Sequence, residues 1–167
     1  MSDPAITFCG DDALRLSAPE RDERLARASQ LQATGDWLEV VPGRHDVTVQ
    51  FDPLEHTPDE AVAHLSCTLA TPAPPPSHTL ETVDLLVHFG GKNGPDLADI
   101  SDRTGLPETE VISRLLSEPL QVDMLGFTPG FAYMSGLDDT IEIPRLLQPR
   151  QQVPAGSIGL NTGQCGL

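Results

Sequence analysis

The sequence predicts a two-domain α+β protein, in which a small α+β domain precedes a barrel-like β domain. The segment from Thr71 to Ser77 holds four prolines, which favour a stiff, extended connector. The residues before it have the pattern of two strands, a helix, two strands and a helix. The last part of the chain changes to short strand-like runs between turns rich in Pro and Gly. We therefore expect domains at residues 1–71 and 79–167, joined by a Pro-rich linker at residues 72–78.

The first domain is expected to open with two short strands, at residues 6–8 and 13–16, around a turn. A helix should follow from Pro19, which suits a first helical position, to about residue 33, with Gly35 just past its end. Leu25, Ala28 and Leu31 give this helix one apolar stripe. The stripe predicts that the helix covers a sheet.

A hairpin and a second helix complete this domain. Its strands are expected at residues 37–41 and 46–51, and the alternation of the second predicts one buried face. The helix should start at Thr57, because Thr57 can cap the chain, Pro58 fits the first turn and Glu60 can reach back as a capping box. The order of elements predicts a small sheet covered by two helices.

The second domain is expected to begin with a buried strand at residues 80–89 and a glycine-rich loop at residues 90–94. Two short helices should follow, at residues 95–103 and 107–116, and then strands at residues 120–127, 141–143 and 157–160. The loop lacks the spacing of a nucleotide-binding loop. Asp96, in the first turn of a helix, is explained by its favourable interaction with the helix dipole.

Composition and charge exclude several classes of function. Acidic residues outnumber Lys and Arg by 25 to 10, and the resulting net charge of −15 repels nucleic acid and anionic lipid. No apolar run approaches the roughly 20 residues of a membrane span, and the N-terminus has no secretory pattern. The three cysteines and five histidines show no ligand spacing, so no metal site is expected. These features predict a cytoplasmic protein.

One alternative comes from another class of protein. The two short helices around Gly105 imitate a helix-turn-helix, with Thr109, Ser113 and Arg114 on the exposed side of the second helix. Acidic residues dominate this segment, however, and would meet the phosphate backbone with repulsion. DNA binding is therefore kept only as a remote alternative.

A series of short motifs carries a resemblance to a known family. In chain order the matching residues are Gly90, Gly91, Gly94, Pro95, Asp96, Leu97, Gly105, Leu106, Glu110, Val111, Ile112, Gly126, Phe127, Pro129, Gly130, Phe131, Tyr133, Gly136, Leu137, Pro144, Arg145, Pro149, Arg150, Val153, Pro154, Ala155, Gly156, Ser157, Gly159, Gly163, Gln164 and Gly166. By these residues the chain resembles the allophanate hydrolase subunit 1 family, or carboxyltransferase subdomains C and D. That family includes the B subunit of 5-oxoprolinase, the sporulation-kinase inhibitor of bacilli and part of urea carboxylase.

The resemblance implies a fold, an activity and partners. The expected fold is a small α+β domain followed by a cyclophilin-like β-barrel. The expected activity is that of the B subunit of a 5-oxoprolinase, which opens 5-oxoproline to glutamate with ATP as co-substrate. The expected partners are a C subunit of related barrel fold and a third subunit. A non-catalytic histidine-kinase inhibitor, or a subunit acting on urea-derived substrates, remains the alternative.

Three departures from the family bear on these expectations. The family usually continues beyond the motif that ends at Gly166, so the barrel is expected to be incomplete and the isolated chain inactive. Leu115 stands where members commonly carry a histidine, which favours the inhibitor alternative. Cys165 replaces the usual threonine and is expected to be a small thiol without a catalytic role.

The candidate ligand-facing residues follow from the chemistry of the implied reaction. A substrate carboxylate needs a bidentate cation, and Arg145 and Arg150 each follow a proline that fixes the backbone before them. The turn formed by Gly126, Phe127, Pro129, Gly130 and Phe131 offers close backbone approach and aromatic walls. Ser157 and Gln164 are expected to hydrogen-bond a ligand at the barrel mouth. Each of these groups has an alternative explanation. The arginines could make structural ion pairs, the turn could simply be packed by its two aromatic rings, and the two polar residues could be ordinary side chains of surface loops. The catalytic residues remain unassigned.

Overall fold

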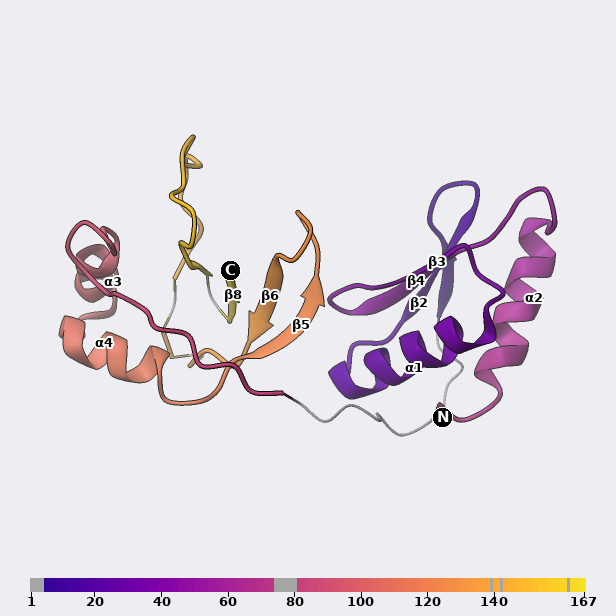
Figure 1. Cartoon of the computed structure of the whole chain (residues 1–167), viewed down its shortest axis with the longest axis horizontal. Coiled ribbons are helices and arrows are strands. Elements are labelled where there is room, and N and C mark those ends of the chain that lie inside the picture. The colour runs from indigo at the N-terminus through magenta and orange to yellow at the C-terminus, as the bar shows by residue number, and fades with distance from the viewer. Residues whose placement is uncertain (1–4, 74–80, 139, 142, 162) are drawn as a thin grey trace. The chain divides into compact units, whose positions relative to one another are not determined.

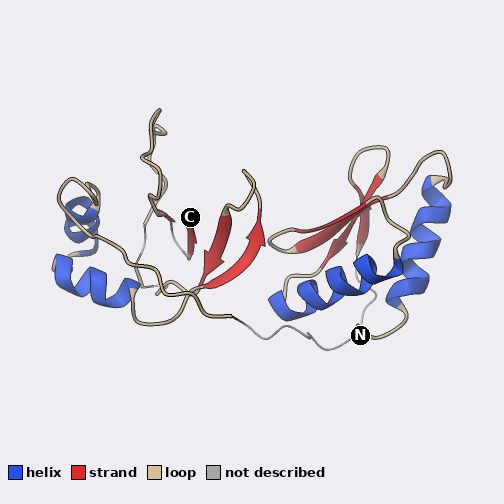
Figure 2. Ribbon diagram, viewed as in Figure 1, coloured by secondary structure: helices blue, strands red, loops and turns tan. Residues whose placement is uncertain are grey.

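The computed structural model describes residues 5–73, 81–138, 140–141, 143–161 and 163–167. The chain forms two compact units, Met1–Glu81 and Thr82–Leu167. Across the described residues the fold mixes helix and sheet, with four helices and two four-stranded antiparallel sheets (Figures 1 and 2). None of these helices is both long and apolar enough to cross a membrane. Most of the expected Pro-rich linker, residues 74–78, lies outside the described residues.

The first unit contains a sheet that is buried on one face. Its strands, in the order β1-β2-β4-β3, are β1 (Ile6–Phe8), β2 (Ala13–Ser17), β4 (Asp46–Gln50) and β3 (Glu39–Pro42). Leu14 lies opposite Val49, and Leu16 lies opposite Val47. Directly opposite residues share a face of the sheet, so these four fully buried side chains form one apolar row.

Two helices cover that apolar face. They are α1 (Arg21–Thr34) and α2 (Pro58–Leu69). Leu31 of α1 and Leu65 of α2 are both fully buried and belong to the same core cluster as the apolar row. The predicted arrangement of a small sheet covered by two helices is therefore observed in this unit. The predicted cap of α2 is also confirmed: the Thr57 hydroxyl accepts from the Glu60 N–H, and the Thr57 N–H donates to the Glu60 carboxylate at 2.9 Å.

The start of α1 differs slightly from the prediction. The helix begins at Arg21 with Glu20 as N-cap, so Pro19 lies just before it. The buried Arg24 explains this entry, because its Nη1 donates to the carbonyl oxygens of Ala18 at 3.3 Å and Pro19 at 3.1 Å. These contacts give the connection from strand to helix polar partners that the backbone alone does not supply.

The second unit has a sheet with the order β5-β6-β8-β7 and two short helices. Its elements are α3 (Leu97–Thr104), α4 (Glu108–Leu115), β5 (Gln121–Leu125), β6 (Ala132–Ser135), β7 (Gly159–Asn161) and β8 (Gln164–Gly166). Met134 of β6 pairs with Cys165 of β8, and both are buried in one core cluster with Ile100 of α3 and Val111 of α4. Both helices thus contribute to the core on this face of the sheet.

Sequence patterns predicted this unit less well. The strand expected at residues 80–89 is wrong for residues 81–89, which form no strand and leave Val83, Leu85 and Leu86 exposed; Leu80 lies outside the described residues. An apolar run becomes a strand only where another strand pairs with it. Ile141 lies in a bend, bonded to the carbonyl of Asp138, instead of the expected strand, and residue 142 is not described.

Two strands of this sheet were not predicted. The expected strands at 120–127 and 157–160 correspond to the shorter β5 and to β7, whereas no element was predicted at β6 or β8. Both are very short, and runs of three or four residues give almost no periodicity.

Candidate functional site

A tight turn joins β5 to β6 and contains five of the predicted site residues. The Gly126 N–H donates to the Phe131 carbonyl at 3.1 Å, and the Phe131 N–H donates to the Thr128 carbonyl at 3.0 Å. Gly130 has a φ of 83°, and Phe127 has a φ of 67°. Positive φ is unfavourable for an aromatic residue, and such conformations often accompany function. The Phe127 side chain is 84% exposed, so packing in its own unit does not account for this conformation.

Three aromatic rings form a row that starts at this turn. The Phe127 and Phe131 ring centroids lie 5.5 Å apart, and those of Phe131 and Tyr133 lie 5.0 Å apart. Both pairs are edge-to-face, the arrangement that the charge distribution of aromatic rings favours. The row gives the sheet an apolar wall that begins at an exposed ring.

A glycine on the neighbouring strand seats the middle ring. Gly166 lies opposite Tyr133 on one side and opposite Gly159 on the other. A Cβ atom on Gly166 would lie 2.5 Å from Cζ of Phe131, which is closer than carbon atoms can approach. The Phe131 ring therefore packs directly on the backbone of β8.

Polar side chains line the same face of the sheet. Gln121 lies opposite Ser135, and Asn161 lies opposite Gln164. Because Met134 pairs with Cys165, the adjacent Ser135 and Gln164 also share a face, the one that bears Tyr133 and Gly166. Gln164 is only 8% exposed. Amides and a hydroxyl can both donate to and accept from a small polar ligand, so this face offers hydrogen bonds beside an aromatic wall.

The predicted arginines lie elsewhere, on a segment in which every residue from 144 to 157 is exposed. Figure 1 shows this orange-to-yellow stretch projecting beyond the sheet of its unit. Arg150 donates from Nη1 and Nη2 to both carboxylate oxygens of Asp96, at 2.6 and 2.5 Å. Arg145 makes no hydrogen bond or ion pair with any residue that the structure describes, and Ser157 is exposed. No polar or ring contact among the described residues joins either arginine to the aromatic row.

The partner of Arg150 was missed by sequence reasoning. Asp96 is the N-cap residue of α3, and its side chain makes no capping hydrogen bond but pairs with Arg150. The hydrogen bonds from Arg150 hold the pKa of Asp96 below its ordinary value, and Asp96 in turn raises the pKa of Arg150. The two residues are 54 positions apart, so no local sequence pattern could have paired them.

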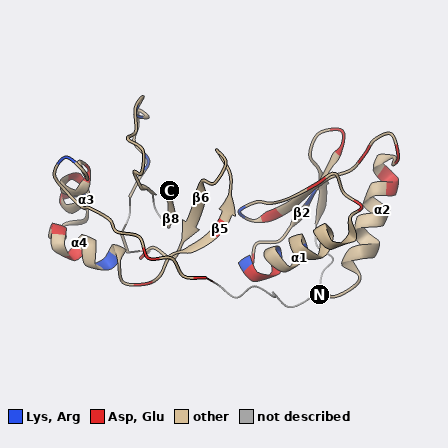
Figure 3. Ribbon diagram, viewed as in Figure 1, with Lys and Arg blue, Asp and Glu red and all other residues tan. Residues whose placement is uncertain are grey.

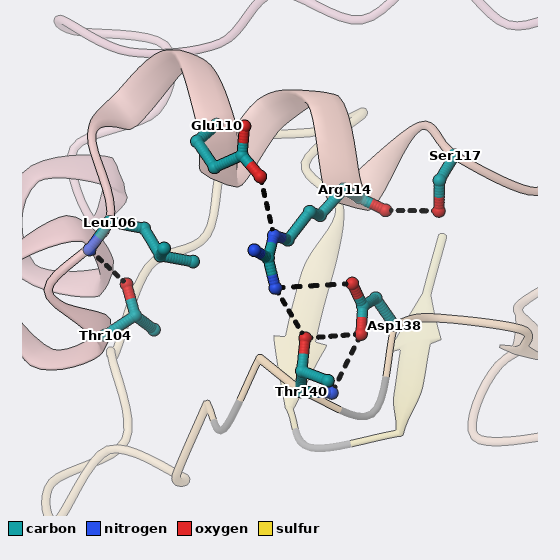
Figure 4. Close-up of polar contacts among 7 residues, drawn as sticks. All are labelled: Thr104, Leu106, Glu110, Arg114, Ser117, Asp138 and Thr140. Carbon is teal, nitrogen blue, oxygen red and sulfur yellow. Dashed lines mark hydrogen bonds and ion pairs between the residues drawn. The ribbon is translucent and has the colours of Figure 1, made fainter.

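A second arginine joins α4 to the loop that follows β6 (Figure 4). Arg114 donates from Nε to Glu110 at 2.9 Å and from Nη1 to the Thr140 hydroxyl at 2.9 Å. Asp138 lies 3.9 Å from the same Nη1, and its pKa is lowered chiefly by hydrogen bonds from the Thr140 hydroxyl and backbone N–H. The side chain that the helix-turn-helix alternative would turn toward DNA is thus held by partners within its own unit.

Two further positions were singled out in the sequence. Cys165 is 2% exposed, and burial raises the pKa of its thiol to about 11, so the thiolate needed for nucleophilic attack is scarce at neutral pH. Leu115 is 7% exposed and belongs to the core cluster beneath the helices. Both side chains serve the packing of the second unit.

Two antiparallel sheets, each in a unit with two helices, place the chain in the α+β class of proteins. The family model for the carboxyltransferase domain, subdomain C and D, matches residues 4–167. The chain therefore belongs to the carboxyltransferase subdomain C and D family, as its motifs predicted.

Curated relatives support the same family assignment. The chain is 31% identical to the B subunit of 5-oxoprolinase from Escherichia coli O157:H7, over all of this chain and 75% of that protein. It is 32% identical to the B subunit of 5-oxoprolinase from Haemophilus influenzae, over 90% of this chain and 70% of that protein. The crystal structure of TTHA0988 matches with a TM-score of 0.76 and 24% sequence identity, over 93% of this chain and 32% of the TTHA0988 chain. The two proteins therefore share a fold.

Proposed function

We propose that the chain is the B subunit of a 5-oxoprolinase-type amidohydrolase, which opens 5-oxoproline to L-glutamate together with partner subunits. The observation that carries this proposal is the match of nearly the whole chain to relatives named as the B subunit of 5-oxoprolinase. The aromatic and polar face of the second sheet adds a surface suited to a small, flat, polar ligand. The proposed compartment is the cytoplasm.

The chemistry of the reaction assigns roles to the predicted residues. A lactam amide is unreactive, so ATP activates its oxygen before water attacks, and the developing charge needs cations or backbone N–H groups. In our proposal Arg145 and Arg150 hold the substrate carboxylate, since a guanidinium binds it in a bidentate manner. Phe127 and Phe131 wall the ligand and Gln164 hydrogen-bonds it, which requires the exposed segment that carries the arginines, residues 144–157, to move toward this face of the sheet.

The remaining predicted residues have supporting roles in the proposal. Gly126, Pro129 and Gly130 shape the turn that brings backbone near the ligand, and Ser157 adds a hydroxyl. ATP enters as co-substrate of the assembled enzyme, and we assign no residue of this chain to it. The isolated chain is proposed to be inactive.

We further propose that the second unit belongs to a cyclophilin-like barrel that works beside a C subunit of related fold and a third subunit. A bulge in β5 between Val122 and Met124 supports the barrel, because bulges bend strands as curved sheets require. The exposed side chains of Val83, Leu85 and Leu86 support an assembly, because large apolar side chains grouped at a surface favour association.

The test is reconstitution of the enzyme. The full chain is co-expressed with candidate C and third subunits, and the purified complex is assayed for ATP-dependent release of glutamate from 5-oxoproline. We expect co-purification and turnover. We also expect Arg150→Lys to raise KM for 5-oxoproline about tenfold or more, because a lysine cannot make the two parallel hydrogen bonds that a guanidinium makes to a carboxylate. A stable complex that releases no glutamate would reject the proposed activity. Release of ammonia from allophanate instead would move the proposal to urea-derived substrates.

Burial of Leu115 favours a second candidate function, a non-catalytic inhibitor of a histidine kinase. At this position members of the family commonly carry a histidine, whereas this side chain is part of the apolar core. An inhibitor would bind a histidine kinase and lower its autophosphorylation without turning over 5-oxoproline. The two functions are separated by running the glutamate assay and a kinase-inhibition assay on the same preparation.

A further inference from the structure

The exposed arm, residues 144–157, differs in charge from the rest of the chain. All 25 acidic residues of the protein lie before residue 143, whereas the arm carries Arg145 and Arg150 and no acid. Its apolar side chains do not anchor it either: Leu146 is 52% exposed, Val153 is 65% exposed and Leu147 is fully exposed. The arm therefore has a local positive charge and little packing to hold it in place.

One ion pair connects this arm to the body of its unit. Among the described residues, the Ser157 N–H donates to the Pro154 carbonyl within the arm, and the pair of Arg150 with Asp96 is the polar contact that reaches outside it. Both side chains of the pair are partly open to solvent, with 45% of Arg150 and 42% of Asp96 exposed. A dissolved anion can therefore reach the pair.

Because of the geometry of the pair, Asp96 competes with a bidentate anion for the guanidinium of Arg150. Asp96 uses both of its oxygens, and Arg150 uses Nη1 and Nη2 together. A ligand carboxylate that binds the same two nitrogens has the same shape and the same charge, so it cannot bind there until Asp96 leaves. A monodentate anion such as chloride gains only part of this interaction and displaces Asp96 less well.

We propose that Asp96 is a specificity-determining residue that occupies the two hydrogen-bonding nitrogens of Arg150 and yields them more readily to a bidentate anion than to a monodentate one, which thereby frees the exposed arm. The role of Arg150 toward a ligand carboxylate rests on the proposed function; the restraint of Arg150 by Asp96 does not. Half-exposed ion pairs are weak, so the competition lowers ligand affinity by a factor of about two to five. The restraint is thus easily reversed.

The restraint is tested first without any ligand, by cleavage of the native full-length chain with trypsin. Trypsin must take an arginine side chain into its own pocket, so Arg150 is a poor site while Asp96 holds it, and Arg145 in the same arm is an internal reference. The initial rates of cleavage after the two arginines are measured by mass spectrometry. In Asp96→Asn we expect cleavage after Arg150, relative to cleavage after Arg145, to rise about two- to fivefold.

Matched variants separate this effect from a general loss of negative charge. Asp102→Asn removes the same charge from an exposed position of the same helix and should leave the ratio unchanged. Asp96→Glu keeps a carboxylate and should restore much of the restraint. An unchanged ratio in Asp96→Asn, or an equal rise in Asp102→Asn, would overturn the proposal.

The competition is tested next with 5-oxoproline, by calorimetric titration of the full-length chain. We expect Asp96→Asn to bind 5-oxoproline about two- to fivefold more tightly than the wild type, and Arg150→Lys to bind it more weakly. Weaker binding by Asp96→Asn would show that Asp96 positions Arg150 instead of competing for it, and would overturn the proposal. Binding that Arg150→Lys leaves unchanged would overturn the ligand role of Arg150 in the proposed function, and the trypsin ratio then decides the restraint by itself.

Discussion

The contact of Phe131 with Gly166 shows how one residue sets the surface of the second sheet. A methyl group at position 166 would overlap the ring, so we expect Gly166→Ala to lower the free energy of unfolding of this unit by about 1–3 kcal/mol. Tyr133, the one tyrosine of the sequence, lies beside the ring and provides a near-ultraviolet circular dichroism signal for the measurement.

A neighbouring glycine provides the control for this substitution. Gly159 lies opposite Gly166, but a Cβ atom there would have nothing within 4 Å. Gly159→Ala should therefore change the stability of the second unit by much less than Gly166→Ala. Equal effects of the two substitutions would mean that loss of glycine in a strand, and not contact with Phe131, determines the stability.

The buried thiol of Cys165 makes the stability of its unit depend on pH. Burial raises the pKa from an ordinary value of 9.0 to about 11. Because the folded pKa lies above the unfolded one, the unfolded chain loses this proton first as the pH rises, and stability is lost between these two values. Urea unfolding followed at pH 8 and at pH 10.5 should show a larger loss of stability in the wild type than in Cys165→Ala. Similar losses in both proteins would contradict the assignment to this thiol.

At the scale of elements, the start of α2 depends on its capping box. Thr57→Ala removes the hydroxyl that accepts from the backbone of Glu60, and caps of this kind stabilise proteins by about 0.5–2 kcal/mol. The loss should appear in the fluorescence of Trp37, the one tryptophan of the sequence, during denaturant unfolding of the first unit. Ser66→Ala, in the exposed middle of the same helix, should have little effect.

The Glu60 carboxylate adds a dependence on pH to the same element. Hydrogen bonds from the backbone and side chain of Thr57 lower the pKa of Glu60. A lowered pKa stabilises the folded state above the unfolded pKa, and this contribution is lost as the pH falls through the folded value. Glu60→Gln, which removes the titrating carboxylate, should therefore reduce the loss of stability of the first unit between neutral and acidic pH. An identical acid response in the two proteins would argue against the capping interaction.

The contact between α4 and the loop after β6 depends on one side chain. Arg114 bridges Glu110 to Thr140, next to the hydrogen bond from the Ile141 N–H to the Asp138 carbonyl. Without the bridge this loop should open more often, so Arg114→Ala should speed amide exchange at Ile141 severalfold. Arg103→Ala, an exposed cation in the last turn of α3, is the comparison and should leave that amide unchanged.

At the scale of the whole molecule, charge governs which partners the chain can approach. Figure 3 shows acidic residues in both units and few basic ones. With a net charge of −15, and with Arg114 held by Glu110, the pair of α3 and α4 is a poor surface for a phosphate backbone. We expect no retardation of duplex DNA by the full chain in a mobility-shift assay at low salt. Retardation that falls steeply as salt is added would revive the helix-turn-helix alternative.

The first unit was more predictable than the second because its signals are local. The alternation of Val47 and Val49, and the cap at Thr57, each lie within a few residues of the element they specify. The second unit depends on pairing across longer distances. The segment 81–89 is rich in apolar residues, as a buried strand is, but it has no partner strand among the described residues.

The sequence alone determined the mixed fold class, the elements of the first unit, the two short helices of the second and the family to which the chain belongs. Only the tertiary structure decided that Phe131 packs on Gly166, that Arg150 binds Asp96 and that Cys165 is buried. The physical reason is range: propensity, alternation and capping act between near neighbours in the chain. Pairing of strands and charges instead depends on which distant segments folding brings together.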